Sequence, residues 1–134
     1  WAMRPLLRAL RTHSRGRLIA AIGRMEGVAI ADVEEVGRMI GRDADALVIH
    51  NHQLNPERVA TFLKGVTRAF DPPVVLRVSS EGRAIGAVLR RAKPRDTVLI
   101  LADDPLRAYQ TVQRAIRQSA PPELAHQPEL PIAR

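Results

Sequence analysis

Two groups of polar side chains follow short apolar runs, at points where parallel strands would end. The first group is His50, Asn51 and His52, directly after the apolar run 46–49. The second group is Asp103 and Asp104, directly after the run 97–101. Ligands of open α/β sheets bind beyond the carboxyl ends of the strands. We therefore predict these five residues as the substrate-binding set.

The two histidines also have the spacing of a metal-binding pair. His50 and His52 are two residues apart, so they would face the same side of a continued strand and could share a metal ion. Asp103 or Asp104 from a neighbouring loop is the only matching third ligand in the sequence. We therefore predict no metal site, and ligand contact and ordinary loop positions remain the two open interpretations of the histidines.

Asp103 and Asp104 have a structural interpretation as well. An aspartate before Pro105 is typical of a helix N-cap, and a carboxylate near a helix N-terminus contributes about 0.3–1 kcal/mol. Cap and ligand both remain open for this pair. Ser79 and Ser80, which precede another helical segment, are predicted to be caps.

Alternating helical and apolar segments must position these residues. Continuous apolar runs predict strands at 17–22, 46–49, 74–78 and 97–101. Apolar residues at helical spacing predict helices at 1–12, 32–41, 81–92 and 105–119, and another that begins at Pro56. We therefore predict an α/β fold, a three-layer sandwich around a mainly parallel, Rossmann-like sheet. The domain spans 1–119, and a Pro-rich tail follows at 120–134.

For two of the helices the sequence predicts the ends or the buried side as well. Asp32 is followed three residues later by Glu35, which predicts an N-cap at Asp32, and Gly41 is predicted to end that helix. In the last helix, the apolar residues are predicted to face inward and the arginines outward. The inward set is Leu106, Val112 and Ile116, and the outward set is Arg107, Arg114 and Arg117.

The composition narrows the class of protein. The 134 residues carry a net charge of +7, which attracts polyanions, but aromatic residues are only 3% and the arginines are scattered, so nucleic-acid binding is not predicted. There is no cysteine, which excludes disulfides and thiolate ligands. No apolar run reaches the roughly 18–20 residues of a membrane span, so we expect a cytoplasmic protein without membrane contact.

Three segments together resemble a known family. They are RPLLRALRTHSRGRLIAAIG, VEEVGRMIGRDADALVIH and VVLRVSSEGRAIGAVLRRAKPRDTVLILADDPLRAYQTV. The sequence from Pro5 to about Arg117 resembles the C-terminal domain of Mur ligases and is most similar to that of cyanophycin synthetase. The strongest likeness is in residues 83–85, the turn 92–96 and the strand end 102–104, which follow one another as in the family.

The resemblance implies part of an ATP-dependent amide ligase. In that family a separate central domain, in the same or a companion chain, binds ATP and Mg²⁺, and the C-terminal domain holds the incoming amino acid or peptide and closes over the nucleotide. Asp103 and Asp104 would then bind a cationic amine. This chain has no G-x-x-x-x-G-K-[ST] phosphate loop, so we expect no cofactor in this chain and no activity from it alone.

The sequence also departs from the family. Residues 26–30 stand where cyanophycin synthetases carry an Asp-Arg pair, and 50–56 replace an Asp-Asn-Pro-Arg loop. These differences favour an alternative, a non-catalytic binding or oligomerisation module on the same scaffold, and a homo-oligomer stays open. Polyanion binding through arginine is a third hypothesis.

Overall fold

Four parallel strands form the centre of this computed structural model, which describes residues 3–50 and 55–119. The strands are β1 (Leu18–Ile22), β2 (Ala46–His50), β3 (Val74–Val78) and β4 (Thr97–Leu101). Their order across the sheet is β3-β2-β1-β4, and every neighbouring pair is parallel. All five residues of β1 are buried, whereas those of the edge strand β4 are half-buried. The continuous apolar runs of the sequence therefore mark strands that are covered on both faces at the centre of the sheet and only partly covered at its edges, β3 and β4.

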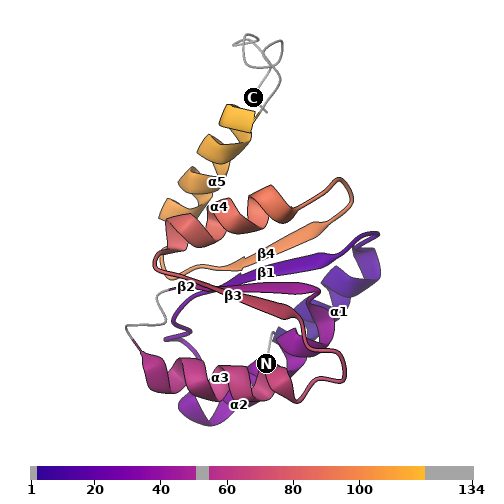
Figure 1. The fold of residues 1–134 in the computed structure, drawn as a ribbon, viewed down its shortest axis with the longest axis vertical. Helices are drawn as coiled ribbons and strands as arrows, with labels where there is room; N and C mark the ends of the chain where they lie inside the picture. The colour runs from indigo at the N-terminus through magenta and orange to yellow at the C-terminus, as the bar shows by residue number, and fades with distance from the viewer. Residues whose placement is uncertain (1–2, 51–54, 120–134) are drawn as a thin grey trace.

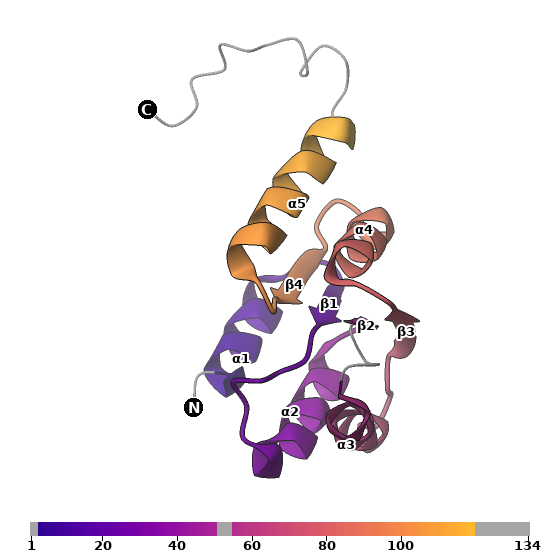
Figure 2. The same ribbon diagram turned by 90° about the vertical axis from the view of Figure 1, so that its left-hand side faces the viewer.

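Five described helices cover the two faces of the sheet (Figures 1 and 2). On one face lie α1 (Met3–His13), α2 (Ile30–Asp43) and α3 (Pro56–Thr67), and on the other lie α4 (Glu81–Arg91) and α5 (Pro105–Ser119). Each layer has its own apolar core, because alternate residues of a strand point to opposite faces. The predicted three-layer α/β sandwich with a parallel sheet is confirmed.

Glycines allow α2 and α3 to pack with their backbones in contact. A Cβ atom at Gly65 of α3 would collide with the Glu34 carbonyl oxygen of α2, and one at Gly37 would collide with the Phe62 carbonyl oxygen of α3. A Cβ at Gly41 would lie 2.9 Å from the Val66 Cα atom. The helices can therefore approach this closely only where side chains are missing.

The boundaries predicted for α2 were wrong at both ends. The helix begins at Ile30, its N-cap is Ala29, and Asp32 lies inside the first turn, where its amide donates to the Ala29 carbonyl oxygen. Asp32 is therefore not the cap. The helix also continues past Gly41 to Asp43, because the glycine serves the contact with α3 instead of ending the helix.

The inward face predicted for α5 was wrong for two of its three residues, whereas Val112 is half-buried and the three arginines are exposed as predicted. Leu106 and Ile116 are 68% and 53% exposed, and the buried residue of this helix is Ala108. Figures 1 and 2 show that α5 lies beside α4 at its N-terminal end and then extends beyond the sheet. The predicted tail, 120–134, lies outside the described residues.

A tight turn fixes the start of β4 against the start of β1. The Asp96 amide donates to the Lys93 carbonyl oxygen at 3.0 Å, and Arg95 has a φ of 81°, so Pro94 and Arg95 fit the central positions of a type II turn. The Asp96 carboxylate accepts hydrogen bonds from the amides of Lys93 (2.8 Å) and Arg17 (2.9 Å) and from the Arg17 guanidinium (3.0 Å). The amide bonds, with a smaller contribution from the guanidinium, lower the Asp96 pKa to about 2.

Replacing Gly65 by alanine should destabilise the domain strongly. The new Cβ would push α3 away from the α2 backbone, and such overpacking costs about 1–3 kcal/mol. Chemical denaturation measures this as a lower midpoint. Gly82→Ala is the matched control, because a Cβ there meets no atom within 4 Å. Equal stability of the two variants would contradict the close packing.

Replacing Asp96 by asparagine should remove part of the acid sensitivity. The folded-state pKa lies below the ordinary 3.8, so the carboxylate stabilises the fold above about pH 4, and this stabilisation is lost as the pH falls towards 2. Denaturation from pH 7 to pH 2 should show the wild type more stable than Asp96→Asn at pH 7, with the difference shrinking in acid. The exposed Asp71→Asn is the control. A difference independent of pH would rule out this linkage.

Candidate functional site

Polar residues from three strand ends meet at the carboxyl edge of the sheet. Arg24 follows β1, His50 ends β2 and Asp103 follows β4. One Asp103 carboxylate oxygen accepts a hydrogen bond from the Arg24 amide at 2.9 Å, and the other lies 3.4 Å from Arg24 Nε and 3.8 Å from His50 Nδ1. The sequence thus placed His50 and Asp103 at the correct edge, and the geometry makes them neighbours.

Gly23 makes this meeting possible. A Cβ atom at this position would lie 2.5 Å from Asp103 Oδ1 and 2.7 Å from His50 Cε1. Any larger residue would therefore displace the aspartate or the imidazole. The glycine allows two side chains from the flanking strands to close over the end of β1.

His50 is the buried polar residue of the described chain and has no exposed surface. Burial lowers the pKa of its imidazole, the Asp103 carboxylate opposes that shift, and the Arg24 guanidinium adds to it. The side chain is therefore predominantly neutral at pH 7. A neutral imidazole beside a carboxylate can accept or hold a proton at this edge.

The two consecutive aspartates have different roles. The Asp104 carboxylate accepts a hydrogen bond from the Arg107 amide at 3.2 Å, which confirms its interpretation as the cap of α5. Asp103 instead binds Arg24, and its own amide donates to Glu81 Oε1 at 3.0 Å. Burial, followed by the neighbouring carboxylates, raises the pKa of Glu81. The backbone hydrogen bonds that its carboxylate accepts lower the pKa and so oppose this shift. The pair thus joins the ends of β4 and β1 to both helices of one layer.

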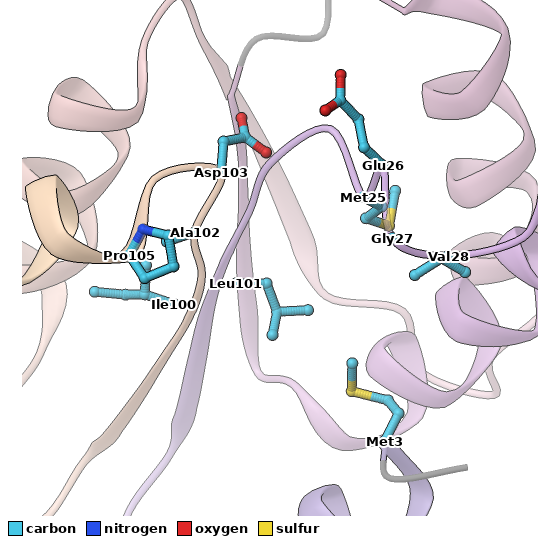
Figure 3. A pocket seen from close by; sticks show the side chains of 10 residues that line it. All are labelled: Met3, Met25, Glu26, Gly27, Val28, Ile100, Leu101, Ala102, Asp103 and Pro105. Carbon is cyan, nitrogen blue, oxygen red and sulfur yellow. The ribbon is translucent and has the colours of Figure 1, made fainter.

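A pocket of about 370 Å³ opens beside this cluster. Figure 3 shows Leu101 and Met3 on its apolar floor, the loop that follows β1 on one side, and Asp103 with Pro105 on the other. Its full lining is Met3, Met25, Glu26, Gly27, Val28, Ile100, Leu101, Ala102, Asp103 and Pro105. The pocket therefore combines a hydrocarbon floor with carboxylates from two loops.

Arg58 of α3 holds the loop that forms one wall of this pocket. Its Nη1 donates to the carbonyl oxygens of Met25 at 2.9 Å and Val28 at 2.7 Å. Met25 has a φ of 57°, in the left-handed region that side chains disfavour. The two bonds from Arg58 stabilise this strained turn and so set the shape of the pocket wall.

Two of the five predicted site residues fall in the segment 51–54. Asn51 and His52 lie outside the described residues, so their role as substrate ligands stays a prediction. Within residues 3–50 and 55–119, no group of three His, Cys, Asp or Glu side chains could hold a metal ion. Over the same ranges, no helix is long and apolar enough to cross a bilayer.

Sequence reasoning missed four residues that build this site. Arg24 and Gly23 follow the first strand, and the rule that singled out His50 would have found them. Glu81 contacts a residue 22 positions away, and Arg58 contacts residues 30 or more positions away. No local sequence pattern therefore marks either residue.

Replacing Asp103 by asparagine should lower the His50 pKa further. The carboxylate opposes the effect of burial, so its loss favours the neutral imidazole. A proton NMR titration of His50 measures this, with Asp104→Asn as the control, because asparagine still caps a helix. An unchanged or higher pKa in Asp103→Asn would contradict the assigned contact.

In the wild type, stability should decrease as the pH falls below about 6.5, since the unfolded histidine binds the proton more readily.

Comparisons with known proteins give a consistent result. A sequence profile of the family described as Mur ligase, glutamate ligase domain, matches residues 1–103. The sequence matches no curated protein. Among solved structures, a domain described as part of a UDP-N-acetylmuramate:L-alanyl-gamma-D-glutamyl-diaminopimelate ligase of Haemophilus ducreyi is similar, with a TM-score of 0.56 and 19% identity. That match covers 86% of this chain and 81% of the other.

The MurF ligase of Thermotoga maritima, solved in complex with ADP, is similar with a TM-score of 0.63 and 17% identity. The match covers 89% of this chain but only 26% of the MurF chain, so this chain corresponds to about a quarter of that enzyme. These identities show a shared fold, and the profile covers most of the sequence. The chain belongs to the Mur ligase family, as its glutamate ligase (C-terminal) domain.

Proposed function

We propose that this domain binds the incoming amino acid or peptide of an ATP-dependent amide ligase of the cyanophycin-synthetase or Mur type. It closes over a nucleotide that a separate domain, in the same or a companion chain, holds with Mg²⁺. Membership of the family supports the reaction class. The loop edge that follows β1 and β4 supports the role of this part.

The pocket beside Asp103 is the observation that carries the proposal. The lining of the pocket contributes two carboxylates at its mouth, Glu26 and Asp103, and Arg24 lies within 3.4 Å of each. Such a mouth attracts the amino group of a substrate. The floor formed by Met3 and Leu101 suits the hydrocarbon part of the same molecule. Asp104, His50 and the loop positions Asn51 and His52 complete the proposed set.

The nucleotide belongs to another part of the enzyme. The sequence has no phosphate loop, so in this proposal the separate domain holds the ATP. ATP supplies the activation of the carboxylate substrate. The residues of this domain hold the amine, and closure of the loop edge excludes water from the reacting groups.

One observation favours a second function, a non-catalytic binding module. The Asp103 carboxylate already binds Arg24, and residues 26–30 lack the Asp-Arg pair of cyanophycin synthetases. A scaffold whose charges are engaged internally can keep its fold without the reaction.

Calorimetry with arginine and aspartate should distinguish the two functions. We expect arginine to bind the chain, and Glu26→Gln to weaken this binding about twofold to fivefold, because Glu26 is an exposed charge at the mouth. Glu57→Gln, on α3 and outside the pocket lining, is the matched control. Mixed with, or joined to, its ATP-binding domain, the chain should support ATP hydrolysis that depends on the amino acid. If no amino acid stimulates hydrolysis, the binding module is the correct function.

A further inference from the structure

The outer surface of α5 combines exposed apolar side chains with unpaired arginines. Leu106 and Tyr109 are 68% and 63% exposed, whereas Ala108 is buried. The helix therefore packs on the domain mainly through Ala108 and the half-buried Val112, and turns its largest apolar residues to solvent. Figures 1 and 2 show its C-terminal half extending beyond the sheet and α4.

The cations of α5 lie along one side of this apolar surface. At about 100° per residue, Arg107, Arg114 and Arg117 share a side of the helix next to the one that carries Leu106 and Tyr109. There is no acidic residue in 105–119. Among the described residues, none of these three arginines forms an ion pair.

A shallow hollow joins the apolar and the cationic side. Its volume is about 450 Å³, and it is lined by Tyr109, Gln110, Gln113, Arg114 and Arg117. The glutamine amides between the two sides can both donate and accept hydrogen bonds. This arrangement offers apolar contact, charge and hydrogen bonds within three turns of one helix.

The opposite layer of the domain uses its cations differently. Arg4, Arg11, Arg38, Arg42 and Arg68 of the α1–α3 layer all pair with carboxylates of that layer. Most of the exposed helix arginines that form no ion pair among the described residues therefore lie on the α4–α5 layer, with Arg8 of α1 as the exception. Net charge alone would not have located them.

We propose that the outer surface of α5 docks an acidic polypeptide segment that carries an apolar stripe. Charge complementarity selects this occupant, because Arg114 and Arg117 line a hollow that contains no acidic residue and therefore attract carboxylates. A second copy of the chain would bring the same three arginines to the contact and be repelled. A helix that lies in a membrane needs a wide apolar face, whereas glutamines interrupt this one. The proposal is independent of the proposed ligase function.

Fluorescence anisotropy with the complete chain tests this docking. The probe is a labelled synthetic helical peptide with leucines at i, i+3, i+7 and glutamates beside them. We expect Arg114→Glu/Arg117→Glu to weaken binding about tenfold, and Leu106→Gln/Tyr109→Gln to weaken it at least threefold. The control, Arg8→Glu/Arg15→Glu, changes the net charge equally at two exposed arginines on and just after α1 and should bind within twofold of the wild type. Circular dichroism confirms that each variant is folded.

Three results would overturn the proposal. One is equal loss of binding in the control and in Arg114→Glu/Arg117→Glu, which would show a response to net charge only. Another is a scrambled peptide of the same composition that binds as well as the probe. The third is evidence for a different occupant of the surface. Tighter binding to phosphatidylserine vesicles than to the peptide would indicate a membrane, and a dimer in sedimentation that Leu106→Gln/Tyr109→Gln abolishes would indicate a second copy of the chain.

Discussion

The close contact between α2 and α3 determines the geometry of the candidate site. The two helices touch through Gly37 and Gly65, so the distance between their axes is set by backbone atoms and not by flexible side chains. This contact places the first turn of α3 beside the loop that leads into α2. Arg58 can then reach the carbonyl oxygens of Met25 and Val28. A glycine contact in the core therefore fixes the wall of a pocket at the edge of the sheet.

At the same edge of the sheet, carboxylates that pair with an arginine also line the pocket. Asp103 binds Arg24 and lies beside His50, yet it still lines the pocket, and Glu26 adds a carboxylate that is 67% exposed. Arg24 lies within 3.4 Å of both carboxylates, so it orients them without neutralising both. In the proposed function, an incoming ammonium group would meet carboxylates that Arg24 has already oriented.

Much of the fold could be predicted from the sequence, because apolar runs and capping residues are local signals. The strand at 97–101 and the cap at Ser80 were predicted correctly, whereas Ser79, predicted as a cap as well, is not the N-cap of that helix. The N-cap predicted at Asp32 was wrong, because a capping pattern four residues long competes with the backbone geometry of the preceding loop. Arg58 could not be found, because its partners lie 30 or more positions away and only the packing of two helices brings them together.

The last helix shows why apolar periodicity alone does not decide which side is buried. An amphipathic pattern predicts that one side of a helix is covered, but not by what. In α5 the domain fully covers only the small side chain of Ala108 and half-covers Val112, and Leu106 and Tyr109 stay in solvent beside three cations. An apolar stripe that the fold leaves exposed has a cost in water that a partner can recover. The sequence pattern that was wrong for the core of this domain is thus the pattern expected of a surface that another polypeptide covers.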